Sequence, residues 1–123
     1  MQVLIVDDSK LARMSIAKLL GALRPAWTRI EATNAEEAMA FKSKDRIDIA
    51  LLDFNMPGRD GLTLAAELHA LDQDMPMAII SANAQDEIVA RAKAIGAGFL
   101  PKPLTQQALA GFLDSVEHRL GTG

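Results

Sequence analysis

The chain divides into two kinds of segment by its pattern of apolar and polar residues. Short apolar runs are typical of strands, and the segments between them repeat apolar residues at helical spacing. The runs predict five strands, at Val3–Val6, Thr28–Ala32, Ile47–Leu52, Met77–Ile80 and Phe99–Leu100. The clearest helical stripes comprise Ala12, Ile16, Leu19, Leu20 and Leu23, then Leu64, Leu68 and Leu71, and finally Leu109, Phe112, Leu113, Val116 and Leu120.

Residues that favour helix ends lie between these segments. Pro25 is expected to close the first helix, and Gly96 to end the fourth. Asn34, with Glu37 three residues later, resembles a capping box for the second helix. Five strands that alternate with helices predict an α/β fold, because right-handed crossovers place helices on both faces of a parallel sheet.

The composition of the strands predicts their order in the sheet. The first, third and fourth runs are almost wholly apolar, as expected for central strands. The second contains Arg29 and Glu31, and the fifth precedes Pro101, which cannot donate a hydrogen bond to an interior ladder. We therefore predict a doubly wound, flavodoxin-like (βα)5 sheet of order 2-1-3-4-5, with residues 1–123 forming a single domain.

Composition narrows the choice of function. Of the 123 residues, none is cysteine, so thiolate nucleophiles and Cys-ligated metals are excluded. His69 and His118 match no metal-binding spacing, which leaves oxygen ligands and hard cations such as Mg²⁺. A net charge of −3 without a basic stripe argues against direct nucleic-acid binding, and no apolar run is long enough to cross a membrane. We expect a cytoplasmic protein with a protein partner.

Five chemically capable residues lie at the carboxyl ends of predicted strands or just beyond them: Asp7, Asp8, Asp53, Ser81 and Lys102. In a doubly wound sheet the carboxyl ends of the strands form the ligand-binding edge, so these side chains are expected to meet there. Clustered carboxylates repel one another by about 3–4 kcal/mol per close pair, which calls for a cation. A nucleophilic carboxylate, a metal site and a lysine are what phosphoryl transfer requires, and Asp53 is the candidate nucleophile.

Four motifs lie at these strand ends: Asp7-Asp8, the run LLDFNMPGRDG at residues 51–61, Ser81-Ala82 and Lys102-Pro103. With these motifs the sequence resembles the response-regulator receiver family over nearly its whole length. The resemblance implies phosphorylation of Asp53 by a sensor histidine kinase or a histidine phosphotransfer protein. It also implies that Asp53, Asp8 and the backbone carbonyl of Asn55 bind Mg²⁺ directly and that Asp7 binds it through water.

The resemblance also implies a switch controlled by phosphorylation. Ser81 would move toward the phosphoryl group, Lys102 would pair with that group, and Phe99 would be the aromatic switch residue. The Lys102-Pro103 bond is commonly cis in the family. The domain would act as a monomer or weak dimer, and would catalyse only its own phosphorylation and dephosphorylation. Its phosphorylated surface would recruit a downstream protein target.

Two features depart from the family pattern. One residue, Gly98, lies between Ala97 and Phe99 where the family usually has two, which shortens the turn before the fifth strand. Asn55 and Asn83, which by family pattern flank the path of the hydrolytic water, are amides that offer no general acid or base.

Each residue taken alone also has an ordinary structural explanation, such as a helix cap for Asp7-Asp8 or a solvated side chain for Lys102. A haloacid-dehalogenase type phosphatase would need a second acid where Asn55 lies, and a flavin site would need donors where Asp7-Asp8 lies. The chain could also be the receiver part of a larger regulator or hybrid kinase. Because Met1 lies so near the first strand and nothing follows the last helix, we expect a stand-alone regulator.

Overall fold

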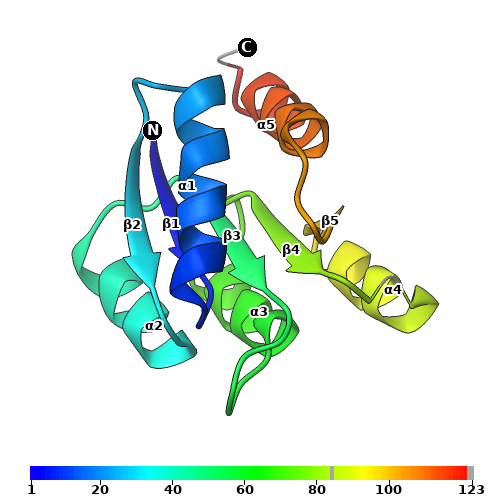
Figure 1. Ribbon diagram of the computed structural model, residues 1–123. Helices are drawn as coiled ribbons and strands as arrows, with labels where there is room; N and C mark the ends of the chain where they lie inside the picture. The colour runs from blue at the N-terminus through cyan, green and yellow to red at the C-terminus, as the bar shows by residue number, and fades with distance from the viewer. Residues whose placement is uncertain (84, 122–123) are drawn as a thin grey trace.

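The computed structural model describes residues 1–83 and 85–121, and strands alternate with helices along the chain (Figure 1). The strands are β1 (Gln2–Val6), β2 (Thr28–Ala32), β3 (Ile49–Asp53), β4 (Met77–Ser81) and β5 (Gly98–Pro101). The helices are α1 (Lys10–Leu23), α2 (Ala35–Lys44), α3 (Gly61–Leu71), α4 (Asp86–Ala94) and α5 (Gln106–Leu120).

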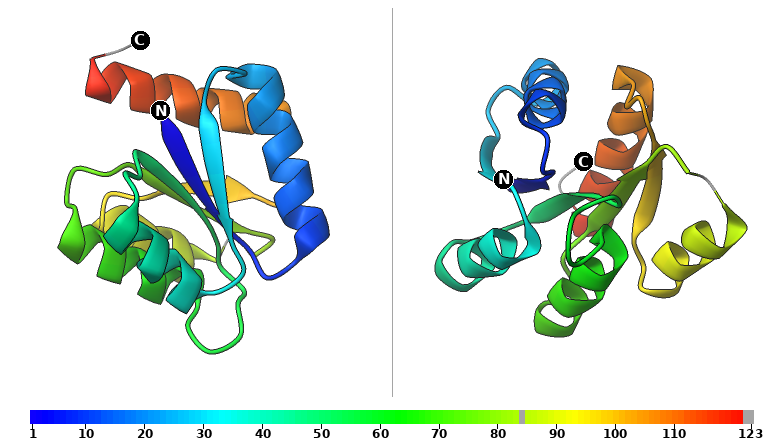
Figure 2. Two further views of the ribbon diagram at one scale, coloured as in Figure 1. Left: turned by 90° about the vertical axis from the view of Figure 1, so that its left-hand side faces the viewer. Right: turned by 60° about the horizontal axis from the view of Figure 1, so that its bottom comes forward.

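All paired strands are parallel, and the sheet has the order β2-β1-β3-β4-β5. This confirms the predicted α/β class, the strand order and the assignment of the second and fifth strands to the edges. Helices α1 and α5 cover one face of the sheet, and α2, α3 and α4 cover the other (Figure 2). Strands β1 and β3 are neighbours, and the strand order reverses between them. Their carboxyl ends therefore lie at the topological switch point of the sheet.

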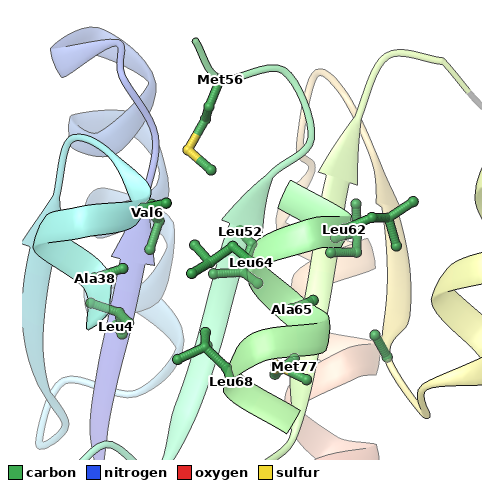
Figure 3. Packing of buried hydrophobic residues seen from close by; sticks show 14 of the residues in the cluster. Leu4, Val6, Ala38, Leu52, Met56, Leu62, Leu64, Ala65, Leu68 and Met77 are labelled. Carbon is green, nitrogen blue, oxygen red and sulfur yellow. The ribbon is translucent and has the colours of Figure 1, made fainter. Parts of the chain in front are cut away.

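Each face of the sheet carries its own apolar core. On the side of α2 and α3, Leu4 and Leu52 of the sheet pack with Leu64 and Leu68 of α3 (Figure 3). On the side of α1 and α5, a second cluster contains Ile5 and other residues from the sheet together with residues from both helices. Every residue of β3 and β4 is buried, because these strands have helices on both faces.

The predicted helix boundaries agree with the structure in most details. Helix α1 ends at Leu23, before Pro25, and Gly96 has a positive φ of 74° just after α4. Asn34 caps α2 by accepting a hydrogen bond from the N–H of Glu37. In a capping box the Glu37 carboxylate would accept a hydrogen bond from the backbone N–H of the cap, Asn34. Here it accepts instead from the N–H and hydroxyl of Thr33, the residue before the cap.

Two further predictions need correction. Strand β3 begins at Ile49 rather than Ile47, although Ile47 is buried, so its apolar character reflects the core and not the ladder. Leu71 and Leu120, assigned to buried helical stripes, are exposed. Each is the last residue of its helix, where the side chain is no longer covered by the sheet. No helix among the described residues is long and apolar enough to cross a membrane.

Candidate metal and phosphoacceptor site

Three of the predicted acidic residues meet at the carboxyl edge of the sheet. Asp7 and Asp8 follow β1, and Asp53 is the last residue of β3. Each of the three offers one carboxylate oxygen, and these oxygens all lie within 4.8 Å of one another. The parallel pairing of β1 with β3 brings together residues more than forty positions apart in the sequence.

The turn that carries Asp7 and Asp8 is built into the start of α1. Asp7 is 1% exposed, and one oxygen of its carboxylate accepts a hydrogen bond of 2.9 Å from the N–H of Ser9. Ser9 is the N-cap of α1 and accepts from the N–H of Ala12 through its hydroxyl. Asp8 is exposed, so the turn presents one buried and one solvent-facing carboxylate.

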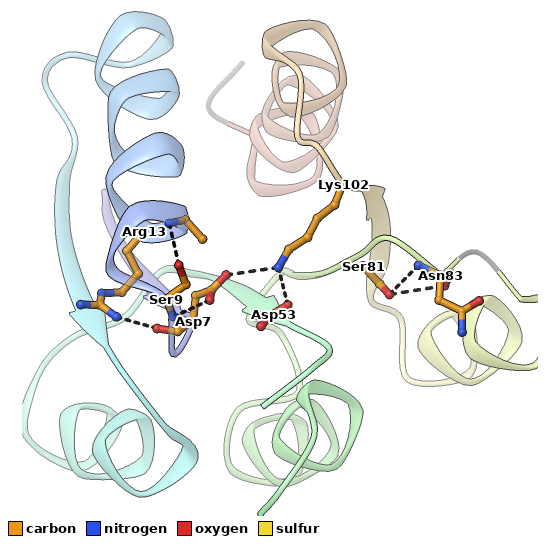
Figure 4. Close-up of polar contacts among 8 residues, drawn as sticks. Asp7, Ser9, Arg13, Asp53, Ser81, Asn83 and Lys102 are labelled. Atoms are coloured by element: carbon orange, nitrogen blue, oxygen red, sulfur yellow. Dashed lines mark hydrogen bonds and ion pairs between the residues drawn. The ribbon is translucent and has the colours of Figure 1, made fainter. Parts of the chain in front are cut away.

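Lys102 lies between the two buried carboxylates (Figure 4). Its Nζ is 2.8 Å from Oδ1 of Asp53 and 3.5 Å from Oδ2 of Asp7. Its backbone N–H donates to the carbonyl of Ser81, the last residue of β4, which continues the pairing with β4 one residue past the end of β5. The Lys102-Pro103 peptide bond is cis, as the family resemblance implied. Two carboxylates are thus paired to one ammonium, which leaves the cluster with excess negative charge.

Burial and charge act on the ionisation of these groups in opposite directions. Burial raises the pKa of Asp53 above its ordinary value, the Asp7 carboxylate adds to this, and the hydrogen bond from Lys102 opposes it. Burial lowers the pKa of Lys102, but the hydrogen bond and charge of Asp53, together with Asp7, outweigh it and raise that pKa overall. Lys102 therefore stays protonated, and a second cation would favour the ionised form of Asp53.

The donor set suits a hard divalent cation. Three carboxylates within 4.8 Å present oxygen ligands only, which Mg²⁺ and similar ions prefer. At that separation each pair of charges repels by about 3–4 kcal/mol at an effective dielectric near 20. A cation would relieve this repulsion, so the residues present fit the predicted metal. Neither His69 nor His118 joins such a group within the described part of the chain.

The two predicted switch residues are less directly connected to the acids. Ser81 is buried, and its hydroxyl accepts a 3.0 Å hydrogen bond from the N–H of Asn83. The same hydroxyl lies 3.4 Å from the carbonyl of Asn83, and among the described residues it makes no hydrogen bond to Asp53 or Lys102 (Figure 4). Phe99 is half-buried and packs against the core on the α3 and α4 side.

One residue that supports the site was not singled out from the sequence. Gly61, the first residue of α3, packs so closely behind Asp53 that an added Cβ would overlap the carbonyl oxygen of Asp53. Its N–H donates a 3.0 Å hydrogen bond to the carbonyl of Phe54. Only glycine fits here without displacing the backbone of the candidate nucleophile. The signal available in the sequence was a glycine just after Asp60, the N-cap of α3.

Comparison with known proteins points to one family. Residues 3–114 match the model of the response regulator receiver domain. The chain is 42% identical over 113 residues to the positive alginate biosynthesis regulatory protein of Pseudomonas aeruginosa, covering 89% of this chain and 44% of that protein. It is 32% identical over 123 residues to the chemotaxis protein CheY-3 of Vibrio cholerae, covering 98% and 94% of the two chains. The chain thus spans less than half of the first relative and nearly all of the second.

A solved structure shows the same fold with related sequence. The complex of CheX, CheY, BeF3 and Mg from Borrelia burgdorferi contains a chain that matches with a TM-score of 0.84 and 30% identity, covering 94% of this chain and 88% of that one. The five-stranded order, the strand-end acids and the family match over residues 3–114 lead to one assignment. The chain belongs to the response regulator receiver domain family, whose members are the signalling switches of two-component systems.

Proposed function

We propose that this receiver accepts a phosphoryl group on Asp53 in a Mg²⁺-dependent reaction. The observation that carries the proposal is the position of the Asp53 carboxylate, which is buried, 2.8 Å from the Lys102 ammonium and within 4.8 Å of two further carboxylates. The cluster is a poor structural ion pair, because its three carboxylates outnumber its one lysine. Once a metal balances this charge, the Asp53 carboxylate is a suitable nucleophile.

The proposed metal ligands are the carboxylates of Asp8 and Asp53, the backbone carbonyl of Asn55, and Asp7 through a water molecule. When bound, Mg²⁺ would neutralise charge on the phosphoryl oxygens. The cluster of carboxylate oxygens supports this role. So does the likeness to the CheY chain that was solved with Mg and BeF3.

The chain's own residues would perform the rest of the reaction. An oxygen of Asp53 would form the new O–P bond while the N–P bond of a phosphohistidine breaks. The electron pair of that bond would stay on the departing ring nitrogen, and the donor's imidazole would take up a proton from solvent. Lys102 would pair with one equatorial phosphoryl oxygen, and the Ser81 hydroxyl would donate to another after leaving Asn83. The reaction catalysed is thus limited to the receiver's own phosphorylation and dephosphorylation.

The proposed donor is a sensor histidine kinase or a histidine phosphotransfer protein, encountered in the cytoplasm. The output would be a phosphorylation-controlled change on the surface near Phe99, which lies on β5 and packs against the core cluster that includes residues of α4. A downstream protein would bind the altered surface. The net charge of −3 supports a protein target rather than nucleic acid for this domain.

Intact mass spectrometry after incubation with a small phosphoryl donor tests the proposal. With Mg²⁺, the native chain is expected to gain a single phosphoryl group, and Asp53→Asn is expected to gain none. Asp72→Asn is a suitable control, because Asp72 pairs with Lys42 away from the acidic cluster. An adduct that persists in Asp53→Asn, or that forms equally in the presence of a chelator, would contradict the assignment.

A further inference from the structure

Asp8 depends on the backbone of its turn for its position. Its side chain is exposed and makes no hydrogen bond or ion pair within residues 1–83 and 85–121. Its carboxylate nevertheless lies within 4.8 Å of those of Asp7 and Asp53. The orientation of the peptide group that joins Asp7 to Asp8 therefore helps to determine whether the carboxylates of these two residues converge on the candidate metal site.

Arg13 holds that peptide group. One guanidinium nitrogen, Nη1, donates a 2.7 Å hydrogen bond to the backbone carbonyl of Asp7, as Figure 4 shows. Because a peptide group is planar, fixing this carbonyl also fixes the N–H and the chain direction of Asp8. On the other side, the N–H of Asp7 donates a 3.1 Å hydrogen bond to the carbonyl of Ala32. The backbone of Asp7 is thus anchored at both its N–H and its carbonyl.

The guanidinium of Arg13 is itself held in place. Its Nε lies 3.1 Å from Oε1 of Glu31, which is on the edge strand β2. The Arg13 side chain is 12% exposed, so little room is left for another orientation. The planar guanidinium donates to Glu31 and to the Asp7 carbonyl at once. The ammonium of a lysine is a compact point charge and has no such pair of donors in one plane.

We propose that Arg13 is a positioning residue for the divalent metal site, acting through the peptide between Asp7 and Asp8. The inference rests on the proposed function, since it assumes that these acids bind Mg²⁺. Helix α1 and strand β2 would then determine the metal geometry together, although neither carries a ligand. Partners that orient metal ligands typically change affinity by about 10–100-fold when removed.

Positioning and simple charge predict opposite effects. If Arg13 acted only as a nearby positive charge, its removal would lessen the repulsion of Mg²⁺ and tighten binding. If it orients the Asp7–Asp8 peptide, its removal weakens binding, and Arg13→Lys also weakens binding although the charge is kept. The direction of the change therefore distinguishes the two roles.

The test is calorimetric titration of the folded protein with Mg²⁺, well below the melting temperature, for the native chain, Arg13→Met and Arg13→Lys. We expect affinity about tenfold weaker for Arg13→Met and at least about threefold weaker for Arg13→Lys. Arg24→Met is the matched control. Arg24 also links two elements, through ion pairs to Asp114 and Glu117 of α5, but it lies outside the acidic cluster. That variant should lose stability and keep the native Mg²⁺ affinity.

Unchanged or tighter Mg²⁺ binding in both Arg13 variants would overturn the positioning role while leaving the proposed function intact. Equal weakening in Arg24→Met would also overturn it, because the effect would then be general loss of stability. Failure of the native chain to bind Mg²⁺ would instead contradict the proposed function, and the positioning role with it. If Arg13→Met does not fold, Arg13→Lys decides the question by the same criterion.

Discussion

The two halves of the proposed phosphoacceptor site are built differently. In the acidic half, Lys102 already contacts both Asp7 and Asp53, and the positions of the two acids follow from buried strand ends. In the switch half, the Ser81 hydroxyl is hydrogen-bonded to Asn83, two residues along the chain, and Phe99 packs against the core on the side of α3 and α4. The acidic half is therefore assembled before any ligand binds, whereas the switch half must exchange contacts to meet a phosphoryl group.

This difference indicates which half would have to rearrange on phosphorylation. The acids gain a partner without rearrangement, so metal binding requires little conformational change. To donate to a phosphoryl oxygen, the Ser81 hydroxyl would have to withdraw the hydrogen bond that it donates to the Asn83 carbonyl, which is worth about 0.5–1.5 kcal/mol. A modest cost of this kind can be met by a charge-assisted bond to a phosphoryl oxygen. Three substitutions measure how independent the halves are.

The largest stability effect is expected from Lys102→Met. Removing the ammonium leaves the Asp7 and Asp53 carboxylates without their shared cation, which should cost about 1–3 kcal/mol of unfolding free energy without Mg²⁺. Because the acids then lack a competing cation, Mg²⁺ should bind more tightly and recover much of the loss. Urea unfolding with and without Mg²⁺ measures both effects.

Lys42→Met is the control for this experiment. Lys42 pairs with Asp72 at 3.0 Å, outside the acidic cluster, and this partly exposed pair should contribute less than about 1 kcal/mol. Its loss should not alter the response to Mg²⁺. If Lys102→Met bound Mg²⁺ more weakly than the native chain, the view of lysine and metal as competing cations would be wrong.

A smaller effect of opposite sign is expected from Asp53→Asn in the absence of metal. Burial raises the pKa of Asp53, so the folded chain holds this proton more tightly than the unfolded chain. Stability from this group is present below the unfolded pKa, about 4, and is lost as pH rises through the folded pKa. The neutral amide avoids that loss and should raise stability at pH 7 by about 1 kcal/mol.

Unfolding of the native chain and Asp53→Asn from pH 4 to 8, without Mg²⁺, tests this sign. The stability advantage of the variant should grow as pH rises. With saturating Mg²⁺ the order should reverse, because the metal stabilises only a chain that binds it. A variant less stable than the native chain at pH 7 without metal would show that the pair with Lys102 outweighs the burial of Asp53.

The smallest effect on the acidic half is expected from Ser81→Ala, a substitution in the switch half. Loss of the hydroxyl should remove about 0.5–1.5 kcal/mol of stability through the bond from the Asn83 N–H. The Mg²⁺ affinity should stay the same, while uptake of a phosphoryl group slows. Ser81→Thr keeps a hydroxyl and should restore uptake. A marked fall in the Mg²⁺ affinity of Ser81→Ala, measured by calorimetry, would mean that the two halves are coupled before phosphorylation.

Much of this molecule was predictable because the relevant physics is local. Central strands must be apolar on both faces, so the runs at β1, β3 and β4 indicated their own burial. Alternation with helices then determined a parallel sheet, and parallel strands bring their carboxyl ends to one edge. The convergence of Asp7, Asp53 and Lys102 follows from these two facts.

Other features depended on side chains that meet only in the folded chain. The apolar residues Ile47 and Leu71 look alike in the sequence, but one is buried and the other is exposed at a helix end. No local pattern shows that Gly61 lies against the carbonyl of Asp53, because the close approach is made by a helix returning onto its strand.

The sequence by itself determined the sheet order, the edge that carries the chemistry and the kinds of residue available there, because each depends on periodicity and on residues next to strand ends. The tertiary structure alone decided which contacts those residues make. It joined Arg13 of α1 to Glu31 of β2 and to the Asp7 carbonyl, and it bonded Ser81 to Asn83 rather than to the acids. The reason is that these contacts depend on distances and directions between elements, which periodicity along the chain does not encode.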